Sequence, residues 1–255
     1  MNLPDILISE FIYELEGLAP RSYSMTKKVI NSIDDIHNIK KIANIGCGHG
    51  YQSVELYEFT KARIISIDHR KEYINNFKKE LNLQKLDKYI HPIHYPLDQI
   101  HLKSNELDLI WSELLPSSIS YKEALIDWSQ FIRENGYIVL CAYCWNTSYI
   151  PEEVAAFFQN NNMEIDYLYN RINDMFDSDL VPVSHHIMPD SCWWNYFCTI
   201  DIELERLSEK YQTNNEVLNF IKGIDLEINL FEKYGEYYSY VFFIGKKTHN
   251  YNKKF

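Results

Sequence analysis

Hydrophobic positions in the first forty residues follow a helical spacing. Apolar side chains recur every three or four positions from Ile6 to Leu15, which predicts an amphipathic helix over residues 4–18. Pro20 ends this segment, because proline cannot continue a helix. A second amphipathic segment predicts another helix over about 22–36.

From residue 41 onward, short apolar runs alternate with longer amphipathic segments. The apolar runs predict strands at 41–45, 63–67, 89–94, 107–111 and 137–143. The segments between them predict helices at 51–60, 70–82 and 121–133. Strands that alternate with helices of this length are typical of a parallel sheet with helices on both of its faces.

The alternation becomes less regular after residue 150. The pattern predicts a helix that begins at Pro151, a helix over 164–177 and a strand over 181–188. A helical stretch over about 201–234 and an aromatic, β-branched strand over 238–245 complete the chain. No linker rich in proline, glycine or serine interrupts this order, so we expect a single domain over residues 1–255.

Composition narrows the possible function classes. The chain has 255 residues, of which 46% are hydrophobic and 24% charged, as in a soluble globular protein. The net charge of −11 argues against a nucleic-acid partner, because a negative surface repels the phosphate backbone. The chain shows no signal-peptide pattern and no apolar run long enough for a bilayer, so we predict a cytoplasmic protein without a membrane partner.

The cysteines indicate reduced thiols rather than disulfides or a metal site. Five cysteines in a chain of this length are typical of a cytosolic protein. Cys141 and Cys144 have a CxxC spacing, but they fall on a predicted strand. Residues three apart on a strand point to opposite faces, so we expect no shared metal ion there.

The strongest chemical signal is a glycine-rich turn between the first predicted strand and its helix. Gly46, Gly48 and Gly50 alternate with other residues, and glycine lets the backbone turn sharply and approach a ligand closely. Asp68 ends the next strand, where a carboxylate can accept both hydroxyls of a ribose. A dinucleotide-binding loop has the spacing GxGxxG, so this spacing favours a ligand with a ribose and an amino-acid tail. A nicotinamide oxidoreductase stays open as a less favoured alternative.

Four segments together resemble the class I S-adenosylmethionine-dependent methyltransferases. They contain Ile42–Gly50, Ile64–Asp68, Leu107–Glu113 and Asn135–Val139, in the order and at the spacing of that family. A further likeness, to bacterial small-molecule-type methyltransferases, covers most of the chain through Met188–Trp193 and Tyr237–Lys246.

The resemblance implies a Rossmann-like, seven-stranded, mostly parallel sheet whose last strand is antiparallel. Residues 37–188 and 237–247 would form this core, 1–36 an N-terminal helical cover, and 189–236 a helical insertion. The cofactor would be S-adenosylmethionine, with glycines at its methionine part, Asp68 at its ribose, and Leu97 and Asp98 at its adenine. The predicted cofactor-binding set is Asn44, Gly46, Cys47, Gly48, Gly50, Asp68, His69, Leu97 and Asp98.

Two positions depart from the family pattern. Asn44 stands where most relatives have aspartate, and Pro96 stands where many have an acidic or hydroxyl residue. Asn44 still offers a carbonyl acceptor, so we expect weakened rather than lost cofactor binding.

The methyl acceptor is expected at the carboxyl ends of the fourth and fifth strands, where open α/β sheets bind ligands. Glu113 follows the fourth strand and is the candidate general base. Its alternative role is a structural charge. The predicted acceptor-binding residues, each of which could instead simply pack or be solvated, are Arg21, Trp111, Trp145, His185 and Trp193.

The sequence thus predicts a monomeric or homodimeric methyltransferase that acts on a small-molecule acceptor. Methyl transfer is an in-line displacement, for which the protein mainly positions the nucleophile and excludes water. The alternative is a non-catalytic protein that senses the cofactor or serves as a scaffold.

Overall fold

The computed structural model describes residues 11, 20–113, 115 and 119–248, so the helix expected over 4–18 lies outside the described residues except for Phe11. The chain divides into two compact units. One contains residues 23–188 and 239–255 and the other contains 1–22 and 189–238. We call them the sheet unit and the helical unit and describe each by itself.

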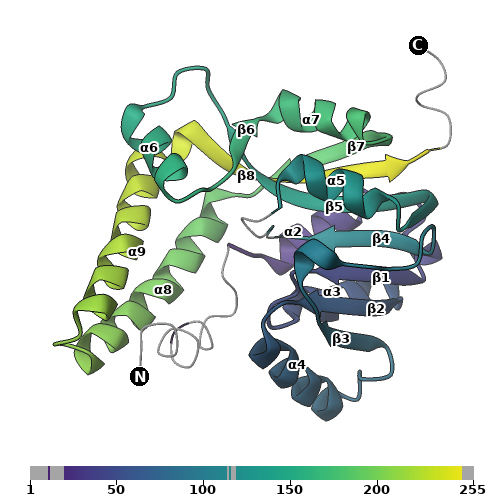
Figure 1. The fold of residues 1–255 in the computed structure, drawn as a ribbon, viewed down its shortest axis with the longest axis horizontal. Helices are drawn as coiled ribbons and strands as arrows, with labels where there is room; N and C mark the ends of the chain where they lie inside the picture. The colour runs from purple at the N-terminus through teal and green to yellow at the C-terminus, as the bar shows by residue number, and fades with distance from the viewer. Residues whose placement is uncertain (1–10, 12–19, 114, 116–118, 249–255) are drawn as a thin grey trace. The chain divides into compact units, whose positions relative to one another are not determined.

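The strands form one sheet, seen side by side in Figure 1. Along the sheet the order is β3, β2, β1, β4, β5, β8, β7, with the short β6 paired to β5. The strands are β1 (Lys41–Ile45), β2 (Arg63–Asp68), β3 (Ile90–His94), β4 (Leu107–Ser112), β5 (Ile132–Trp145), β6 (Ile165–Tyr167), β7 (Leu180–Ile187) and β8 (Tyr238–Lys247).

Strands β1 to β6 pair in parallel, whereas β7 and β8 are antiparallel to each other. This confirms the predicted mostly parallel sheet. The expected seven strands become eight with β6. Every residue of β4 is buried, as expected for a central strand covered on both faces.

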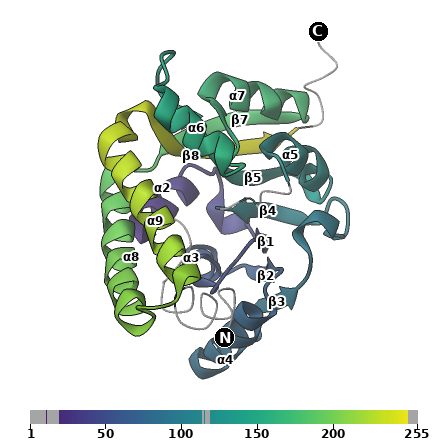
Figure 2. The same cartoon turned by 60° about the vertical axis from the view of Figure 1, so that its left-hand side comes forward.

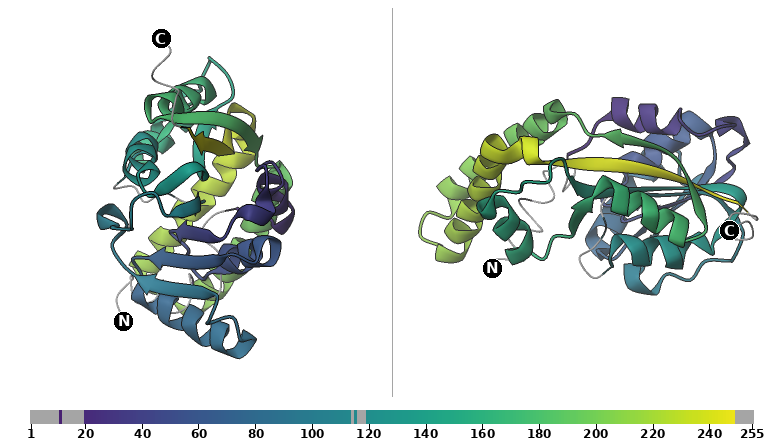
Figure 3. Two further views of the ribbon diagram at one scale, coloured as in Figure 1. Left: turned by 90° about the vertical axis from the view of Figure 1, so that its right-hand side faces the viewer. Right: turned by 90° about the horizontal axis from the view of Figure 1, so that it is seen from above.

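Helices cover both faces of the sheet. They are α2 (Tyr23–Ile30), α3 (Tyr51–Thr60), α4 (Lys71–Gln84), α5 (Tyr121–Ser129), α6 (Glu152–Asn160) and α7 (Leu168–Asp177), with short 3₁₀ turns η2 (Ile36–Asn38) and η3 (Leu97–Gln99). The view from above in Figure 3 places α2 on one side of the sheet and α5 and α7 on the other. The core beneath α5 packs Tyr121, Leu125 and Trp128 against strand residues such as Ile110 and Leu140.

The strand order reverses at β1, which lies between β2 and β4. Asn44 pairs with Ser66 on one side and with Trp111 on the other. The carboxyl ends of β1, β2 and β4 therefore meet at one edge of the sheet, which is where ligands bind in sheets of this kind.

The helical unit contains α8 (Asp190–Lys210), α9 (Asn215–Tyr234) and the turn η4 (Gly235–Tyr237). The two long helices pack side by side (Figures 1 and 2). An aromatic cluster joins them. The ring of Trp193 stacks on Phe231 with centroids 4.9 Å apart, and Phe197 and Tyr238 pack around this pair.

Several predicted boundaries were wrong. The helix expected over 22–36 ends at Ile30, and the one expected over 121–133 ends at Ser129, because Ile132 pairs with Leu107 in the sheet. The helix expected over 164–177 begins with strand β6, and the helical stretch expected from about 201 begins at Asp190.

Candidate functional site

The loop from Gly46 to Gly50 connects β1 to α3 and is tied to the end of β2. The backbone N–H groups of Gly46 and Cys47 both donate to the carbonyl of Ile67, at 2.8 and 3.0 Å. Gly46, Gly48 and Gly50 have φ values of 74°, 52° and 88°, in the left-handed region that favours glycine. Glycine is therefore needed here to form this turn at the sheet edge.

The glycines do not share one role. A methyl group on Gly50 would lie 2.2 Å from the Phe77 ring of α4, so this glycine lets α3 and α4 approach each other. A methyl group on Gly48 would meet no atom within 4 Å. The open space over Gly48 is what a ligand lying against the loop requires, and it fits the cofactor that the sequence predicts.

Cys47 has a buried side chain within the same loop. Burial, and then the nearby charge of Asp68, raises the pKa of its thiol well above the ordinary range. The thiol therefore stays protonated near neutral pH and does not act as a nucleophile.

Asp68 ends β2 beside the glycine loop, and its side chain is fully buried. Its Oδ2 accepts hydrogen bonds from the backbone N–H of Gly48 at 2.9 Å and from Arg70 Nη2 at 3.1 Å. Its Oδ1 accepts from the backbone N–H and the Nε of Arg70, at 2.9 and 3.0 Å. Burial by itself raises the pKa of Asp68, but these donors and the charge of Arg70 outweigh burial, and the pKa is lowered.

Aromatic rings extend this cluster away from Asp68. The Arg70 guanidinium lies over the Tyr73 ring, 4.1 Å from its centroid. The His49 ring stacks on the same Tyr73 with centroids 4.3 Å apart. His69 is exposed, with its Nδ1 3.7 Å from Asp68 Oδ1.

Glu113 lies just beyond β4 at the same edge of the sheet. Its Oε1 accepts from the indole N–H of Trp111 at 2.9 Å, and its Oε2 accepts from Gln52 Nε2 of α3 at 3.2 Å. The half-buried carboxylate is therefore held by donors from two elements. A carboxylate oriented in this way can accept a proton or orient a polar group.

Asn44 lies beneath the loop in a buried polar network. Its Nδ2 donates to Ser53 Oγ at 2.9 Å, and the Ser53 hydroxyl lies 2.7 Å from Ser66 Oγ. This network joins β1, α3 and β2. The side-chain amide of Asn44 thus ties the strand before the loop to the helix after it.

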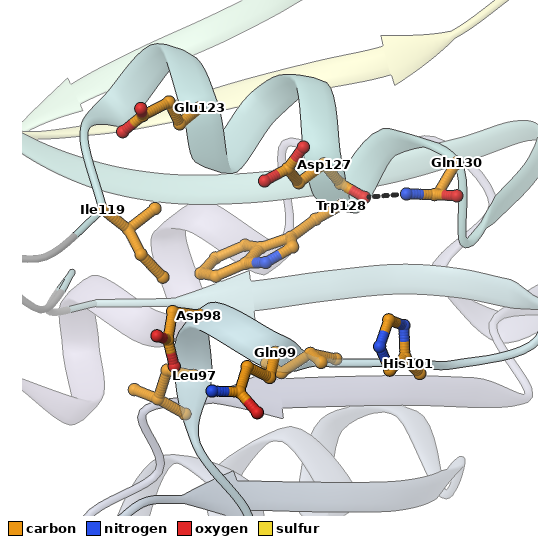
Figure 4. A pocket seen from close by; sticks show the side chains of 10 residues that line it. Leu97, Asp98, Gln99, His101, Ile119, Glu123, Asp127, Trp128 and Gln130 are labelled. Atoms are coloured by element: carbon orange, nitrogen blue, oxygen red, sulfur yellow. Dashed lines mark hydrogen bonds between the residues drawn. The ribbon is translucent and has the colours of Figure 1, made fainter.

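Leu97 and Asp98, predicted at the adenine edge, line a cavity of about 350 Å³ between η3 and α5 (Figure 4). Trp128 of α5 points its indole ring into this space. The two predicted adenine neighbours therefore border a real recess. The cavity is lined by Leu97, Asp98, Gln99, Ile100, His101, Ile119, Glu123, Asp127, Trp128 and Gln130.

Within the sheet unit, the predicted acceptor-binding residues Trp111, Trp145 and His185 pack against different partners. Trp111 is fully buried and packs against Phe242, while Trp145 packs against Phe158. His185 is exposed on the edge strand β7, four strands along the sheet from β1.

Trp193 and Arg21 belong to the helical unit rather than the sheet unit. Trp193 is 3% exposed within the aromatic cluster, so packing is its observed role. Their predicted role in acceptor binding stays a prediction.

A metal site is absent among the described residues, where no three histidine, cysteine or acidic side chains come together. Cys141 and Cys144 are both buried in β5. Within the described parts of the chain, no helix combines the length and apolar character needed to cross a bilayer.

Sequence reasoning missed Gln52, Ser53, Arg70 and Tyr73. Arg70 is two residues after Asp68, so a local Asp-x-Arg pattern was visible and could have indicated an ion pair. Gln52 and Ser53 had no such signal, because they lie on α3 and their partners Glu113 and Asn44 lie in other segments of the chain.

Comparison with known proteins identifies the family. A family model described as "Methyltransferase domain" matches residues 36–223, which is more than half of the chain. No curated protein matches the sequence.

Solved structures with the same fold share little sequence with this chain. An S-adenosylmethionine-dependent methyltransferase from Thiobacillus denitrificans, in complex with S-adenosylhomocysteine, has a TM-score of 0.80 at 13% identity, covering 96% of this chain and 99% of its own. A putative sarcosine dimethylglycine methyltransferase from Galdieria sulphuraria has a TM-score of 0.72 at 12% identity, with coverage of 89% and 85%. Geranyl diphosphate C-methyltransferase from Streptomyces coelicolor A3(2), in complex with Mg²⁺, geranyl diphosphate and S-adenosylhomocysteine, has a TM-score of 0.66 at 12% identity, with coverage of 88% and 77%.

The chain belongs to this methyltransferase domain family and has its Rossmann-like fold. It therefore contains a methyltransferase domain. The predicted methyltransferase family, fold class and enzyme class are thereby confirmed.

Proposed function

We propose that this methyltransferase transfers the methyl group of S-adenosylmethionine to a small molecule. Two of the similar structures carry names of enzymes that act on small molecules, sarcosine or dimethylglycine and geranyl diphosphate. The net charge of −11 supports the same class, because it disfavours an RNA acceptor.

The cofactor position rests chiefly on the open space over Gly48. The methionine part would lie against the loop from Gly46 to Gly50, with the ribose near Asp68 and His69. The adenine would approach Leu97 and Asp98, which border the cavity beside η3. Asn44 would support the loop from below rather than contact the ligand.

The cofactor supplies a methyl group already activated on a sulfonium. The protein's own residues then have to orient the acceptor, exclude water and remove a proton from an N–H or O–H nucleophile. Glu113 is suited to the last task because Trp111 and Gln52 fix the direction of its carboxylate. In this role an oxygen of Glu113 accepts the proton that the acceptor loses.

The test uses S-adenosylmethionine labelled in its methyl group and a cell extract separated into metabolite, RNA and protein fractions. We expect the wild-type protein to label the metabolite fraction. The Gly48→Val variant serves as the control for background transfer and should label nothing. Label in the RNA or protein fraction, with none among metabolites, would contradict a small-molecule acceptor.

A further inference from the structure

Glu113 and Cys141 lie side by side at the carboxyl edge of the sheet. The register between β4 and β5 pairs Trp111 with Val139. Side chains two residues apart on a strand point to the same face, so Glu113 and Cys141 follow this pair on its own face of the sheet. Burial, and then the charge of Glu113, raises the pKa of the Cys141 thiol well above its ordinary range. This effect of the carboxylate on the thiol agrees with their placement next to each other.

Aromatic rings from β5 and β8 adjoin this pair. Tyr143 follows on the same face of β5, and its ring centroid lies 4.9 Å from that of Tyr240 on the neighbouring strand β8. Phe242 is the next residue on that face of β8, and it packs against Trp111 with ring centroids 6.1 Å apart. The indole of Trp111 in turn donates to Glu113. The carboxylate, the thiol and the two phenol rings therefore share one face at the edge where the acceptor is expected.

Of the side chains in this group, Glu113 alone is charged at neutral pH. Burial, and then the neighbouring thiol, phenol and carboxylate, raises the pKa of Tyr240 well above its ordinary range. The thiol of Cys141 and the hydroxyl of Tyr240 therefore stay neutral near pH 7, and both side chains are 2% exposed. Glu113 and Tyr143 are half-buried, so a ligand at the sheet edge can reach them. Such a ligand meets one negative charge and an aromatic ring.

A ligand beside Glu113 has to complement that charge. A carboxylate or phosphate group placed there would be repelled by the Glu113 carboxylate. An alcohol carries no charge to match it and has no attraction of this kind to the face of a ring. An ammonium group is attracted both to the carboxylate and to the negative face of an aromatic ring. The arrangement thus favours an amine over an alcohol or an anion.

We propose that the methyl acceptor is an amine, whose nitrogen binds between the Glu113 carboxylate and the ring of Tyr143. This inference rests on the proposed function and names its class of acceptor. Glu113 accepts a proton from the ammonium group, which leaves a neutral nitrogen with a free electron pair. That pair forms the new bond to the methyl carbon while the bond from this carbon to sulfur breaks and its electrons stay on the sulfur. The positive charge of the sulfonium thereby passes to the methylated amine.

The first test identifies the atom that receives the methyl group. The wild-type protein is incubated with S-adenosylmethionine that carries a deuterated methyl group and with the metabolite fraction of a cell extract. Fragmentation in a mass spectrometer then locates the deuterated methyl group in each product. We expect it on nitrogen, in molecules that were amines before the reaction.

The second test removes the ring from the site. Tyr143→Leu should raise KM for the amine found in the first test roughly two- to thirtyfold, the range of a cation–π contact. Tyr143→Phe keeps a ring and should stay within about twofold of wild type. Both should bind S-adenosylhomocysteine as wild type does, because neither changes the glycine loop. Tyr137→Leu is the matched control, since Tyr137 lies earlier in the same strand, and it should leave KM unchanged. Thermal melts check that each variant is folded.

Two results would overturn the proposal. The first is a deuterated methyl group on oxygen, sulfur or carbon of the metabolite products. The second is a folded Tyr143→Leu protein with the KM of wild type, because the ring would then not contact the amine. The first test needs only the wild-type chain, so it decides the acceptor class even where Tyr143→Leu does not fold. Absence of any deuterated metabolite would instead contradict the small-molecule acceptor on which the inference rests.

Discussion

Two carboxylates, one in each unit, respond to burial in opposite ways. Asp68 in the sheet unit is fully buried, yet its pKa is lowered, because donors surround it and outweigh burial. Glu227 in α9 of the helical unit is half-buried, and burial raises its pKa. It lies four residues before the buried Phe231, on the apolar side of the helix. Among the described residues, no hydrogen bond or ion pair is found for its carboxylate.

The difference shows that the donors around an acid, more than its burial, decide its charge state. Asp68 favours the folded state at neutral pH, and this contribution is lost only as pH falls through its lowered pKa. Glu227 acts in the other direction, because its ionised form disfavours the folded state once pH rises above its ordinary pKa. Hydrogen bonds in the sheet unit thus stabilise the charge of Asp68. In the helical unit, burial instead makes the charge of Glu227 unfavourable.

The largest expected effect is on cofactor binding, and it comes from comparing a substitution at one glycine in each unit. Gly48→Val places a side chain in the open space over the loop and should abolish S-adenosylhomocysteine binding in calorimetry. The strained φ adds a cost of about 1–3 kcal/mol, so a thermal melt must confirm folding. Gly223→Ala in α9 meets no atom and should leave binding unchanged while stabilising the protein by about 1 kcal/mol. Normal binding by a folded Gly48→Val protein would mean that the loop is only a turn.

The next prediction compares two glutamates. Glu113→Gln should lower turnover roughly 10²–10⁴-fold, the usual contribution of a general base, with cofactor affinity and melting temperature nearly unchanged. Glu227→Gln is the matched control and should leave cofactor affinity unchanged. Turnover of Glu113→Gln within a few-fold of wild type would assign Glu113 a structural role. The assay is methyl transfer to the acceptor found in the labelled metabolite fraction.

A smaller effect is expected at Asp68. Asp68→Asn keeps the shape of the side chain but removes the charge that holds Arg70, so S-adenosylhomocysteine affinity should fall roughly ten- to hundredfold. The protein should also lose its Asp68-dependent stability at neutral pH, while wild type and variant converge only as pH falls through the lowered pKa of Asp68. Calorimetry and melts across pH measure both. Unchanged affinity would argue that the ribose lies elsewhere.

The smallest effect concerns stability alone. Glu227→Gln removes an ionisable group whose pKa is raised by burial, and it should increase the melting temperature at pH 7 by about 2–4 °C. The gain should vanish near pH 4, where the wild-type carboxyl is protonated and resembles the amide. A loss of stability at pH 7 would reveal a partner for Glu227 that stabilises its charge.

Much of the fold followed from local patterns. Strand β1 and helix α3 begin and end where the apolar runs and glycines predict. Both the apolar pattern that buries one face and the glycines that allow a tight turn lie within a few neighbouring residues, so they are visible in the sequence. The glycine loop and Asp68 were placed at one edge for the same reason. The beginning of α8 at Asp190 also had a local signal, since Pro189 and an acidic residue commonly open a helix.

Other features were decided only when distant segments met. Ile132 became part of β5 rather than of α5 because Leu107 offers it a partner across the sheet. Glu113 gained Gln52 as a donor, and Asn44 gained Ser53, through contacts between a strand and a helix. Such pairings depend on sheet register and helix packing, which no single segment specifies.

The sequence by itself determined the family pattern, the glycine turn and the position of Asp68, because these depend on residue type and short spacing. The tertiary structure decided how Asp68 is used. Folding buried its carboxylate and surrounded it with donors from Gly48 and Arg70. Whether such a group binds a ligand or holds another residue depends on which donors lie within about 3 Å, and that arrangement exists only in the folded chain.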